Sequence, residues 1–177
     1  MAIVLAGRTK PHIERASSAH AEQISALLHA AFREFEALYT PEGFLATTPS
    51  ADEISRRLAD GPSWIAADGS TIVGTVSAVD RGGEVYIRSM AVLPAARSRR
   101  VAADLLAVVH AYARTVGARW LTLNTTPFLS AAIRLYERDG FRRVAGTLDL
   151  CGTPLITMVK ELETFAATVS PHISYDL

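Results

Sequence analysis

The sequence predicts one α/β domain built around a mixed β-sheet. Three observations support this prediction. The 177 residues fit one domain, which we expect to span 1–177 with a core over about 12–160. Helical and strand-like periodicities alternate along the chain without a linker or an internal repeat. Three closely spaced strand-like segments are followed by a strand–helix–strand unit, which combines antiparallel with parallel pairing. We expect six to seven strands and about four helices.

The first third of the chain is predicted to be mainly helical. A short strand over 12–15 precedes a helix with an apolar stripe at Ile24, Leu27, Leu28, Ala31 and Phe35. Residues 36–49 contain two prolines and a glycine and are interpreted as a loop. Ser50 and Glu53 match a capping box, which predicts a short helix ending at Gly61–Pro62.

Turn residues divide the next segment into three strands. Asp68–Gly69 is a strong hairpin signal, and Gly82–Gly83 makes the following turn. We expect strands over 64–67, 71–79 and 84–92. Because these strands are closely connected, they should pair antiparallel.

From Ser98 onward the apolar period becomes helical. The stripe consists of Val101, Leu105, Val108, Val109, Tyr112 and Val116. A strand over 120–124 should pair parallel with 84–92. Ser130 is expected to cap a last helix that ends at Gly140, followed by strands over 141–146 and 155–160. His110 lies off its helix's apolar stripe and is expected to be solvated.

Composition excludes several classes of protein. The sequence has 18 Lys and Arg residues and 18 Asp and Glu residues, so its formal net charge is zero. Because nucleic-acid-binding proteins usually have a surplus of basic residues, this balance disfavours nucleic-acid binding. No apolar run approaches the ~20 residues that a membrane helix needs. The single cysteine permits neither an internal disulfide nor a cysteine cluster for zinc, and we expect no metal. The first basic residues follow a short apolar run, the reverse of a secretion signal, so we expect a cytoplasmic protein.

Two segments carry candidate chemistry. Arg97, Arg99 and Arg100 lie where a helix begins, and there unpaired main-chain amides and the helix dipole favour an anion such as pyrophosphate. The alternative is a solvated basic turn. Tyr136 lies on the inner stripe of the last helix, and its alternative is a core tyrosine with its hydroxyl at the rim.

Together these segments resemble a known family. Residues 90–106, Met-Ala-Val-Leu-Pro-Ala-Ala-Arg-Ser-Arg-Arg-Val-Ala-Ala-Asp-Leu-Leu, are similar to the acetyl-CoA-binding motif of the GNAT superfamily of N-acetyltransferases. In that motif, a strand ending in Val-x-Pro leads to Arg/Gln-x-x-Gly-x-Gly/Ala and a helix. Residues 131–141 resemble the family's second motif, Ala-x-x-Leu-Tyr-x-x-x-Gly-Phe. The resemblance covers about 12–160 and implies the GNAT fold, with a splayed pair of parallel strands at the cofactor site.

The resemblance also implies roles for residues. Acetyl-CoA would be the cosubstrate, with its pantetheine arm along the strand that ends at Val92 and its pyrophosphate on the amides of 97–102. Tyr136 would protonate the departing thiolate, and a tyrosine pKa of about 10 suits this task. The implied cofactor-binding residues are Met90, Ala91, Val92, Arg97, Ser98, Arg99, Arg100, Val101, Ala102 and Asn124.

The sequence departs from the family pattern at four places. Ser98 and Arg100 stand where the family usually has glycine; at a positive φ a non-glycine residue costs roughly 1 kcal/mol. Leu129 replaces a common asparagine. Many relatives carry a glutamate near Ser89, where this chain has Arg88–Ser89, so the general base is unassigned. A water relay or an amine deprotonated in solution would replace it.

The expected activity is direct acetyl transfer to a primary amine of a small molecule or a peptide. Residues 36–49 and 146–154 should form the acceptor pocket, where Glu36 would attract a cationic amine and Tyr39 or Phe44 would pack against it. The alternative is a non-catalytic module that binds CoA or a partner. A homodimer is left open, with the tail over 165–177 packing on a neighbouring copy.

Overall fold

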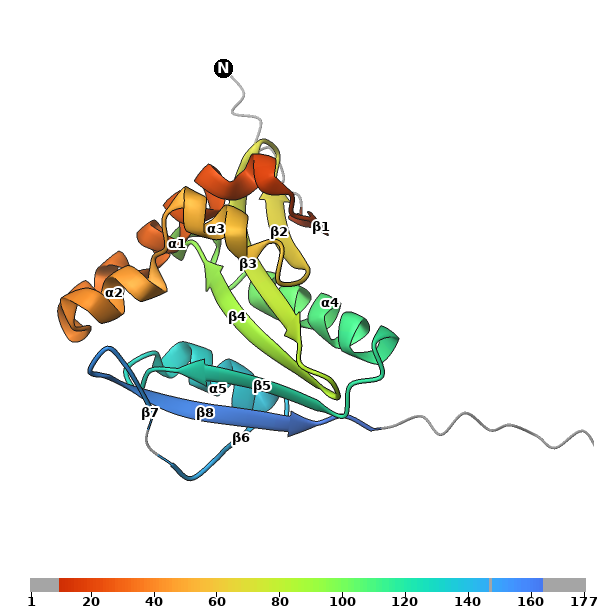
Figure 1. Ribbon diagram of the computed structural model, residues 1–177. Coiled ribbons are helices and arrows are strands. Elements are labelled where there is room, and N and C mark those ends of the chain that lie inside the picture. Colours follow the sequence, from red (N-terminus) through yellow and green to blue (C-terminus); the bar gives the residue numbers. More distant parts are fainter. Residues whose placement is uncertain (1–9, 147, 164–177) are drawn as a thin grey trace, which may run out of the picture.

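The computed structural model describes residues 10–146 and 148–163 (Figure 1). These residues form eight strands, five α-helices and three 3₁₀-helices. The strands are β1 His12–Arg15, β2 Ser63–Asp68, β3 Thr71–Asp80, β4 Glu84–Val92, β5 Trp120–Thr125, β6 Arg142–Arg143, β7 Leu148–Leu150 and β8 Thr153–Glu161. The α-helices are α1 Ala21–Phe32, α2 Pro41–Thr47, α3 Ala51–Arg57, α4 Val101–Thr115 and α5 Ser130–Arg138. The 3₁₀-helices are Ser18–His20, Arg33–Leu38 and Pro94–Ala96.

The strands form one mixed sheet in the order β1-β2-β3-β4-β5-β8-β6, with β7 added to β8. The β4–β5 pair is parallel, and the other pairs are antiparallel. This arrangement confirms the predicted α/β fold class with its parallel pair. The described residues contain one strand and one α-helix more than expected, and α2 and β7 are these additions.

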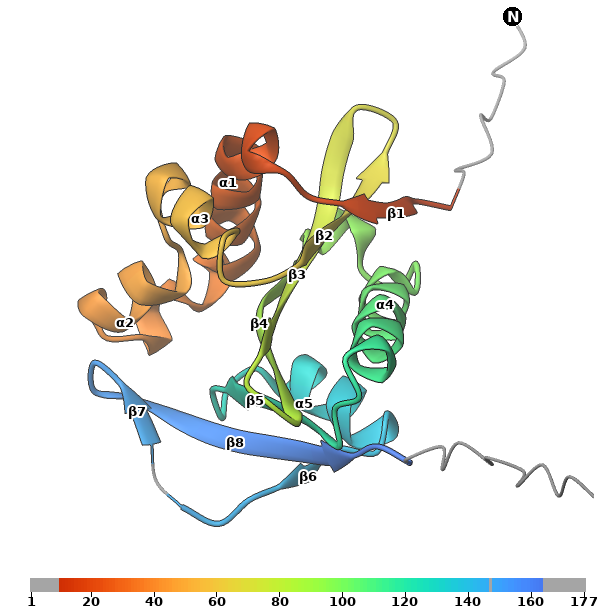
Figure 2. The same cartoon turned by 45° about the vertical axis from the view of Figure 1, so that its right-hand side comes forward.

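Helices cover both faces of the sheet (Figure 2). α1 and α3 pack on one face, where Leu28, Ile54 and Ile65 belong to one apolar cluster. α4 packs on the other face, and its Leu105 and Val109 are fully buried in a second, larger cluster. The stripes predicted for α1 and α4 are therefore the faces that the two layers bury.

The prediction of a loop over 36–49 is wrong, because this segment contains α2. Thr40 has extended backbone, and its hydroxyl accepts a hydrogen bond from the Gly43 N–H at 3.1 Å. Pro41 stands at the first helical position, where its missing N–H costs nothing. The residues that suggested a loop are thus the start of a short helix.

Two helix boundaries also differ from the prediction. The Ser50 hydroxyl accepts from the Glu53 N–H at 3.3 Å, but α3 ends at Arg57, before Gly61–Pro62. The Glu53 carboxylate is bound to Arg56 and Arg57 instead of completing the capping box. Ser130 is the first helical residue of α5, with Leu129 at the N-cap and no side-chain cap.

The last strands are shifted relative to the prediction. The strand expected over 141–146 is reduced to Arg142–Arg143, and β8 begins at Thr153 and extends to Glu161. The Leu162 N–H donates to the Arg119 carbonyl at 2.8 Å. Residues 165–177, the tail for which dimer packing was predicted, lie outside the described residues. Within the described ranges, no helix is long and apolar enough to cross a membrane.

Candidate active site

The candidate site begins where the two parallel strands stop pairing. β4 and β5 are in register from Glu84–Trp120 to Ile87–Leu123, and beyond this point β4 pairs with β3 and β5 pairs with β8. A bulge inserts one extra residue into β4 here, next to Ser89, which has a φ of 51°. Such a bulge bends its strand, so β4 turns away from β5 and leaves an opening between them.

A cleft of about 1240 Å³ lies at this opening. Most of the cofactor-binding residues implied by the resemblance line it, together with the tyrosine. These are Met90, Ala91, Val92, Arg97, Ser98, Arg100, Val101, Ala102, Asn124 and Tyr136. Arg99 does not line the cleft, because its Nη1 donates to the Asp68 Oδ2 at 2.7 Å, next to the β2–β3 turn.

The turn before α4 has left-handed backbone at two non-glycine positions. Ser98 has a φ of 66°, and Arg100, the N-cap of α4, has a φ of 61°. The first helical hydrogen bond of α4 runs from the Asp104 N–H to the Arg100 carbonyl at 3.0 Å. The N–H groups of residues 101–103 therefore have no partner within the helix and present donors and a positive dipole end to the cleft.

The three arginines of this turn have different environments. Arg97 pairs with Glu34, and its Nη2 also reaches the Ala31 carbonyl at 3.4 Å. Arg99 is held by Asp68. Arg100 lines the cleft, is exposed and forms no ion pair within the described ranges. Arg100 therefore offers its full charge to an anion in the cleft.

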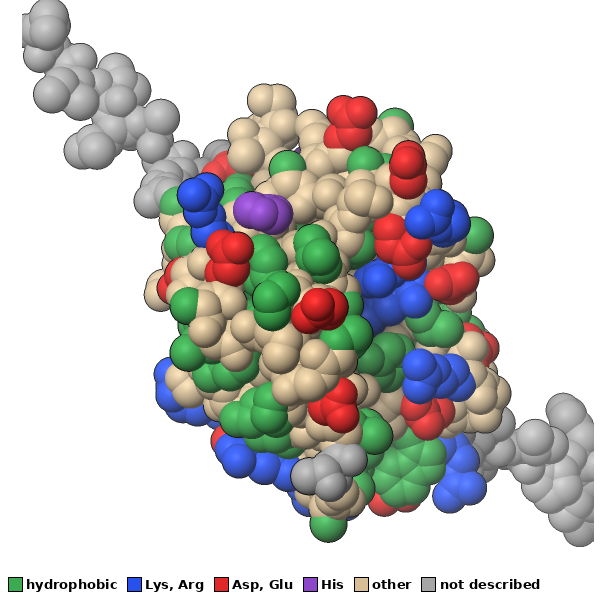
Figure 3. Space-filling view, turned by 60° about the vertical axis from the view of Figure 1, so that its left-hand side comes forward, with side chains coloured by type: hydrophobic (Ala, Val, Ile, Leu, Met, Phe, Trp, Pro, Cys, Tyr) green, Lys and Arg blue, Asp and Glu red, His purple; other side chains and the backbone are tan. Residues whose placement is uncertain are grey.

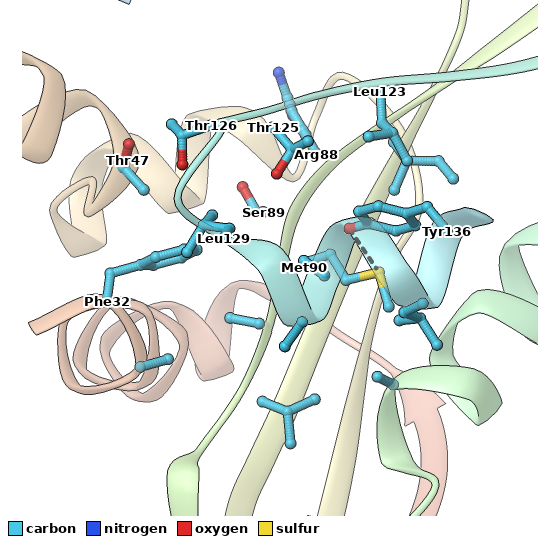
Figure 4. Close-up of a pocket in the computed structure, with 18 of the residues that line it drawn as sticks. Phe32, Thr47, Arg88, Ser89, Met90, Leu123, Thr125, Thr126, Leu129 and Tyr136 are labelled. Carbon is cyan, nitrogen blue, oxygen red and sulfur yellow. Dashed lines mark hydrogen bonds between the residues drawn. The ribbon is translucent and has the colours of Figure 1, made fainter. Parts of the chain in front are cut away.

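Tyr136 lies in the wall of the cleft on α5. Its side chain is 6% exposed, and its O–H donates to the Met90 Sδ at 3.4 Å, marked by the dashed line in Figure 4. Burial raises the pKa of the Tyr136 phenol well above its ordinary value, because an apolar environment disfavours the charged form. The phenol is thus a protonated donor in the cleft at neutral pH.

The described carboxylates that line the cleft are all paired with cations. Glu53 binds Arg56 and Arg57, and Asp60 binds Arg88. Asp139 is bonded to His110 and Lys160. Glu84, the carboxylate on β4, lies at the far end of the strand beside Arg81 and outside the cleft.

The prediction of a solvated His110 is wrong. The side chain is buried under α5, and its Nε2 lies 2.7 Å from the Asp139 Oδ2. Lys160 also donates to this carboxylate, at 2.9 Å. Burial raises the pKa of Asp139, but its bonds to His110 and Lys160 outweigh this effect, and the net shift is downward. This cluster joins α4, α5 and β8 beneath the cleft.

At the mouth of the cleft, two hydrogen bonds join the start of α2 to the turn between β7 and β8. The Thr40 hydroxyl donates to the Cys151 carbonyl at 2.7 Å, and the Thr40 N–H donates to the Thr153 Oγ1 at 3.0 Å. Tyr39 lines the cleft, and burial raises the pKa of its phenol. Glu36 and Phe44 line a separate pocket of about 320 Å³, which they share with Tyr39.

A family model described as the acetyltransferase (GNAT) family matches residues 24–141, more than half of the chain. The chain belongs to the GNAT family. No curated protein matches the sequence significantly.

Solved structures of GNAT proteins share the fold at low sequence identity. The PaiA N-acetyltransferase from Thermoplasma acidophilum, solved with coenzyme A, has a TM-score of 0.75 at 15% identity and covers 87% of this chain and 100% of its own. The putative acetyltransferase yncA from Salmonella typhimurium, solved with acetyl-CoA, has a TM-score of 0.67 at 20% identity, over 90% of this chain and 98% of its own. Ard1 from Thermoplasma volcanium has a TM-score of 0.69 at 17% identity, over 87% and 99%.

Several cleft residues of this GNAT chain were missed by the sequence analysis. Arg88 and three aromatic residues, Phe32, Phe35 and Phe128, line the cleft. The Phe128 ring lies 4.8 Å from that of Tyr39 and 6.3 Å from that of Phe35. Periodicity placed Phe35 in the apolar stripe of the first helix, but Phe35 lies in the 3₁₀-helix that follows α1. The other three come from separate segments and belong to no common period. From the sequence, Arg88 and Ser89 indicate only that the glutamate found in many relatives is absent at this place.

Charges of both signs share the surface of the GNAT domain. On the face shown in Figure 3, many Lys and Arg side chains lie next to Asp and Glu side chains. This distribution agrees with the balanced charge of the sequence. No group of three metal-ligating side chains occurs in the ranges 10–146 and 148–163.

Proposed function

We propose that this GNAT protein is an N-acetyltransferase that transfers the acetyl group of acetyl-CoA directly to a primary amine of a small molecule or a peptide. One observation carries the proposal: a single cleft joins the diverging ends of β4 and β5, the turn before α4 and the buried Tyr136 phenol. The similar structures that hold CoA or acetyl-CoA support the choice of cosubstrate. The single cysteine suits a cytoplasmic location.

The residues of the cleft fit acetyl-CoA. Beyond Ile87, no strand of the described part of the chain pairs with β4 on its β5 side, so the β4 main chain at Met90 and Val92 suits the amides of a pantetheine arm. The N–H groups at the start of α4 and the Arg100 charge suit a pyrophosphate. When bound, acetyl-CoA supplies an activated thioester. The chain's own residues position it and handle the protons.

Tyr136 is proposed as the general acid. Its raised pKa keeps the phenol protonated across the physiological range, so that its proton is available to a departing thiolate. Met90, which accepts the Tyr136 hydrogen bond, occupies the place where we expect the sulfur of the cosubstrate. We expect the Met90 Sδ to be exchanged for that sulfur as hydrogen-bond acceptor.

The amine must lose a proton without a free carboxylate nearby. Ser89, Thr125 and Thr126 line the cleft and supply hydroxyls that can hold a water (Figure 4). We propose that the amine arrives deprotonated or loses its proton through such a water. A water molecule would thus take the role of general base that a glutamate has in many relatives.

Thermal unfolding with acetyl-CoA is the first test. At ~100 times its dissociation constant, the ligand should stabilise the fold by about 2.7 kcal/mol, a rise of several degrees. CoA release with a panel of primary amines then tests transfer. A thermal shift with no CoA release from any amine would favour the second candidate, a non-catalytic CoA-binding module. The pairing of every described carboxylate in the cleft motivates that candidate.

A further inference from the structure

Arg88 has unused hydrogen-bond donors at the wall of the cleft. From these donors we infer that the acceptor is an amine that also carries a carboxylate, which Arg88 binds. This inference rests on the proposed acetyl transfer and names the substrate class.

The donors of Arg88 can be counted. Its Nη2 donates to the Arg57 carbonyl at 2.9 Å and to the Asp60 Oδ2 at 2.6 Å, which uses both hydrogens of that nitrogen. Its Nε is buried and has no hydrogen-bond partner among residues 10–146 and 148–163. Its Nη1 makes no hydrogen bond to any described residue. Three of the five N–H donors of a guanidinium are thus unused, and a buried donor without a partner is unfavourable.

The position of Arg88 is fixed by its neighbours. It lies on β4, paired with Ser77 on β3, immediately before the left-handed Ser89 and two residues before Met90. Its contacts with the end of α3 hold the guanidinium against the cleft, with 22% of the side chain exposed. An anionic group bound to Arg88 would therefore lie beside the same segment of β4 as Met90, whose Sδ accepts the Tyr136 hydrogen bond.

A carboxylate is the group that suits these donors best. Because both Nη2 hydrogens are already used, no parallel pair of N–H donors is free, and a carboxylate would accept a single charge-assisted bond from Nη1. Asp60, the partner already present, is half exposed and engages only Nη2, so it leaves the remaining donors available. The aromatic wall of Phe32, Phe35 and Phe128 faces the same cleft and suits an apolar body on the acceptor.

The charges of the cleft disfavour a purely cationic acceptor. The carboxylates that could attract a second ammonium group, Glu53 and Asp60, are bound to arginines. A polyamine would have to compete with these fixed partners and would meet the Arg88 charge. An amino acid presents one amine to transfer and one carboxylate to Arg88.

The test compares matched acceptors. Leucine, methionine and phenylalanine are assayed as free acids, as amides and as the decarboxylated amines, by CoA release with saturating acetyl-CoA. The wild-type kcat/KM should favour the acids over the amides by about tenfold or more, which corresponds to one charge-assisted bond. Arg88→Gln should reduce this preference to about threefold or less, and Arg88→Lys should restore part of it.

Two further variants separate binding from folding. Asp60→Asn leaves Arg88 in place and removes its competing anion, so it should increase the preference for acids. Arg56→Gln is the control for loss of an arginine near this site: Arg56 lies on α3 next to Arg57, binds Glu53 and does not line the cleft. It should leave the preference unchanged. Amides that match acids in the wild type, or an equal loss for acids and amides in Arg88→Gln, would overturn the inference.

A binding measurement keeps the inference distinct from the proposed activity. If no amine of any kind releases CoA, the acetyl-transfer proposal fails. Calorimetry of the N-acetylated acids and amides with the CoA-saturated protein then tests Arg88 alone. Tighter binding of the acids, lost in Arg88→Gln, would support the carboxylate site. Equal binding of acids and amides would refute it.

Discussion

Replacement of Arg100 by glycine should stabilise the protein. Arg100 is the N-cap of α4 and has a φ of 61°, a conformation that crowds the Cβ of any L-residue. Glycine has no Cβ and is also among the residues accepted at an N-cap. The substitution therefore removes strain without disturbing the first hydrogen bond of α4, from Asp104 to the Arg100 carbonyl.

The size of the gain follows from two opposing effects. Left-handed backbone costs an L-residue about 1–2 kcal/mol, and the greater freedom of glycine in the unfolded chain costs about 0.5–1 kcal/mol. The net gain is about 0.5–1 kcal/mol, which raises the Tm of a chain of this length by about 1–4 °C. Differential scanning calorimetry of the free protein measures this change.

Arg100→Ala is the matched control. It removes the same side-chain charge but keeps a Cβ at the same φ, so it should give no such rise in Tm. Both variants lose one cation from the cleft, so both should show the same reduction in the Tm shift caused by acetyl-CoA. A larger acetyl-CoA shift in Arg100→Gly alone would mean that the side chain obstructs the cleft. Equal Tm values for Arg100→Gly and Arg100→Ala would refute the strain argument.

Four other predictions concern the cleft and its support. Tyr136→Phe should lower kcat by about 10²-fold, since general acids contribute at least this much, while leaving the acetyl-CoA dissociation constant within about twofold; unchanged kcat would remove Tyr136 as the acid. Because burial raises the pKa of Tyr136, the wild-type kcat should show no decline from tyrosine ionisation up to about pH 10, and a Tyr136-dependent decline below pH 9 would contradict this. Asp139→Asn should cost about 1–2 kcal/mol at pH 7 in urea unfolding. The folded pKa of Asp139 is lowered, so its contribution is present above the unfolded value and is lost as pH falls through the folded one; the difference from wild type should therefore narrow below about pH 4. Gly43→Ala should destabilise by about 1–3 kcal/mol, because the new Cβ would lie 2.3 Å from the Thr153 Oγ1 and 2.9 Å from the Leu150 carbonyl; an unchanged urea midpoint would show that α2 can shift without cost.

The elements with strong local signals could be predicted from the sequence. The stripes of α1 and α4 and the hairpin turns of the central strands depend on residues close together in the chain, and the structure has these elements. α2 was missed because Pro41 and Gly43 suggest a loop by composition. Pro41 and Gly43 nevertheless lie in a helix, because the Thr40 hydroxyl caps its N-terminus.

The site could be predicted only in part, for a similar reason. The motif residues from Met90 to Ala102 are contiguous, so a sequence pattern can identify them. The environments of the three arginines depend on Glu34 and Asp68, which are remote in sequence. Arg88 likewise has a partner 28 residues away, and its unused donors are visible only in three dimensions. Contacts across the fold therefore decide which charges remain available.

The bonds from Thr40 to Cys151 and Thr153 have a consequence for engineering this protein. They join segments that are 111 and 113 residues apart and so tie α2 to the β7–β8 turn. A chimera could take its α2 segment from a homologue and keep its own β7–β8 hairpin. It would lose these bonds if the homologue has other residues at the positions of Thr40 and Thr153. Acceptor preference should therefore transfer between homologues only when both segments are exchanged together, and the pair should behave as one inherited unit.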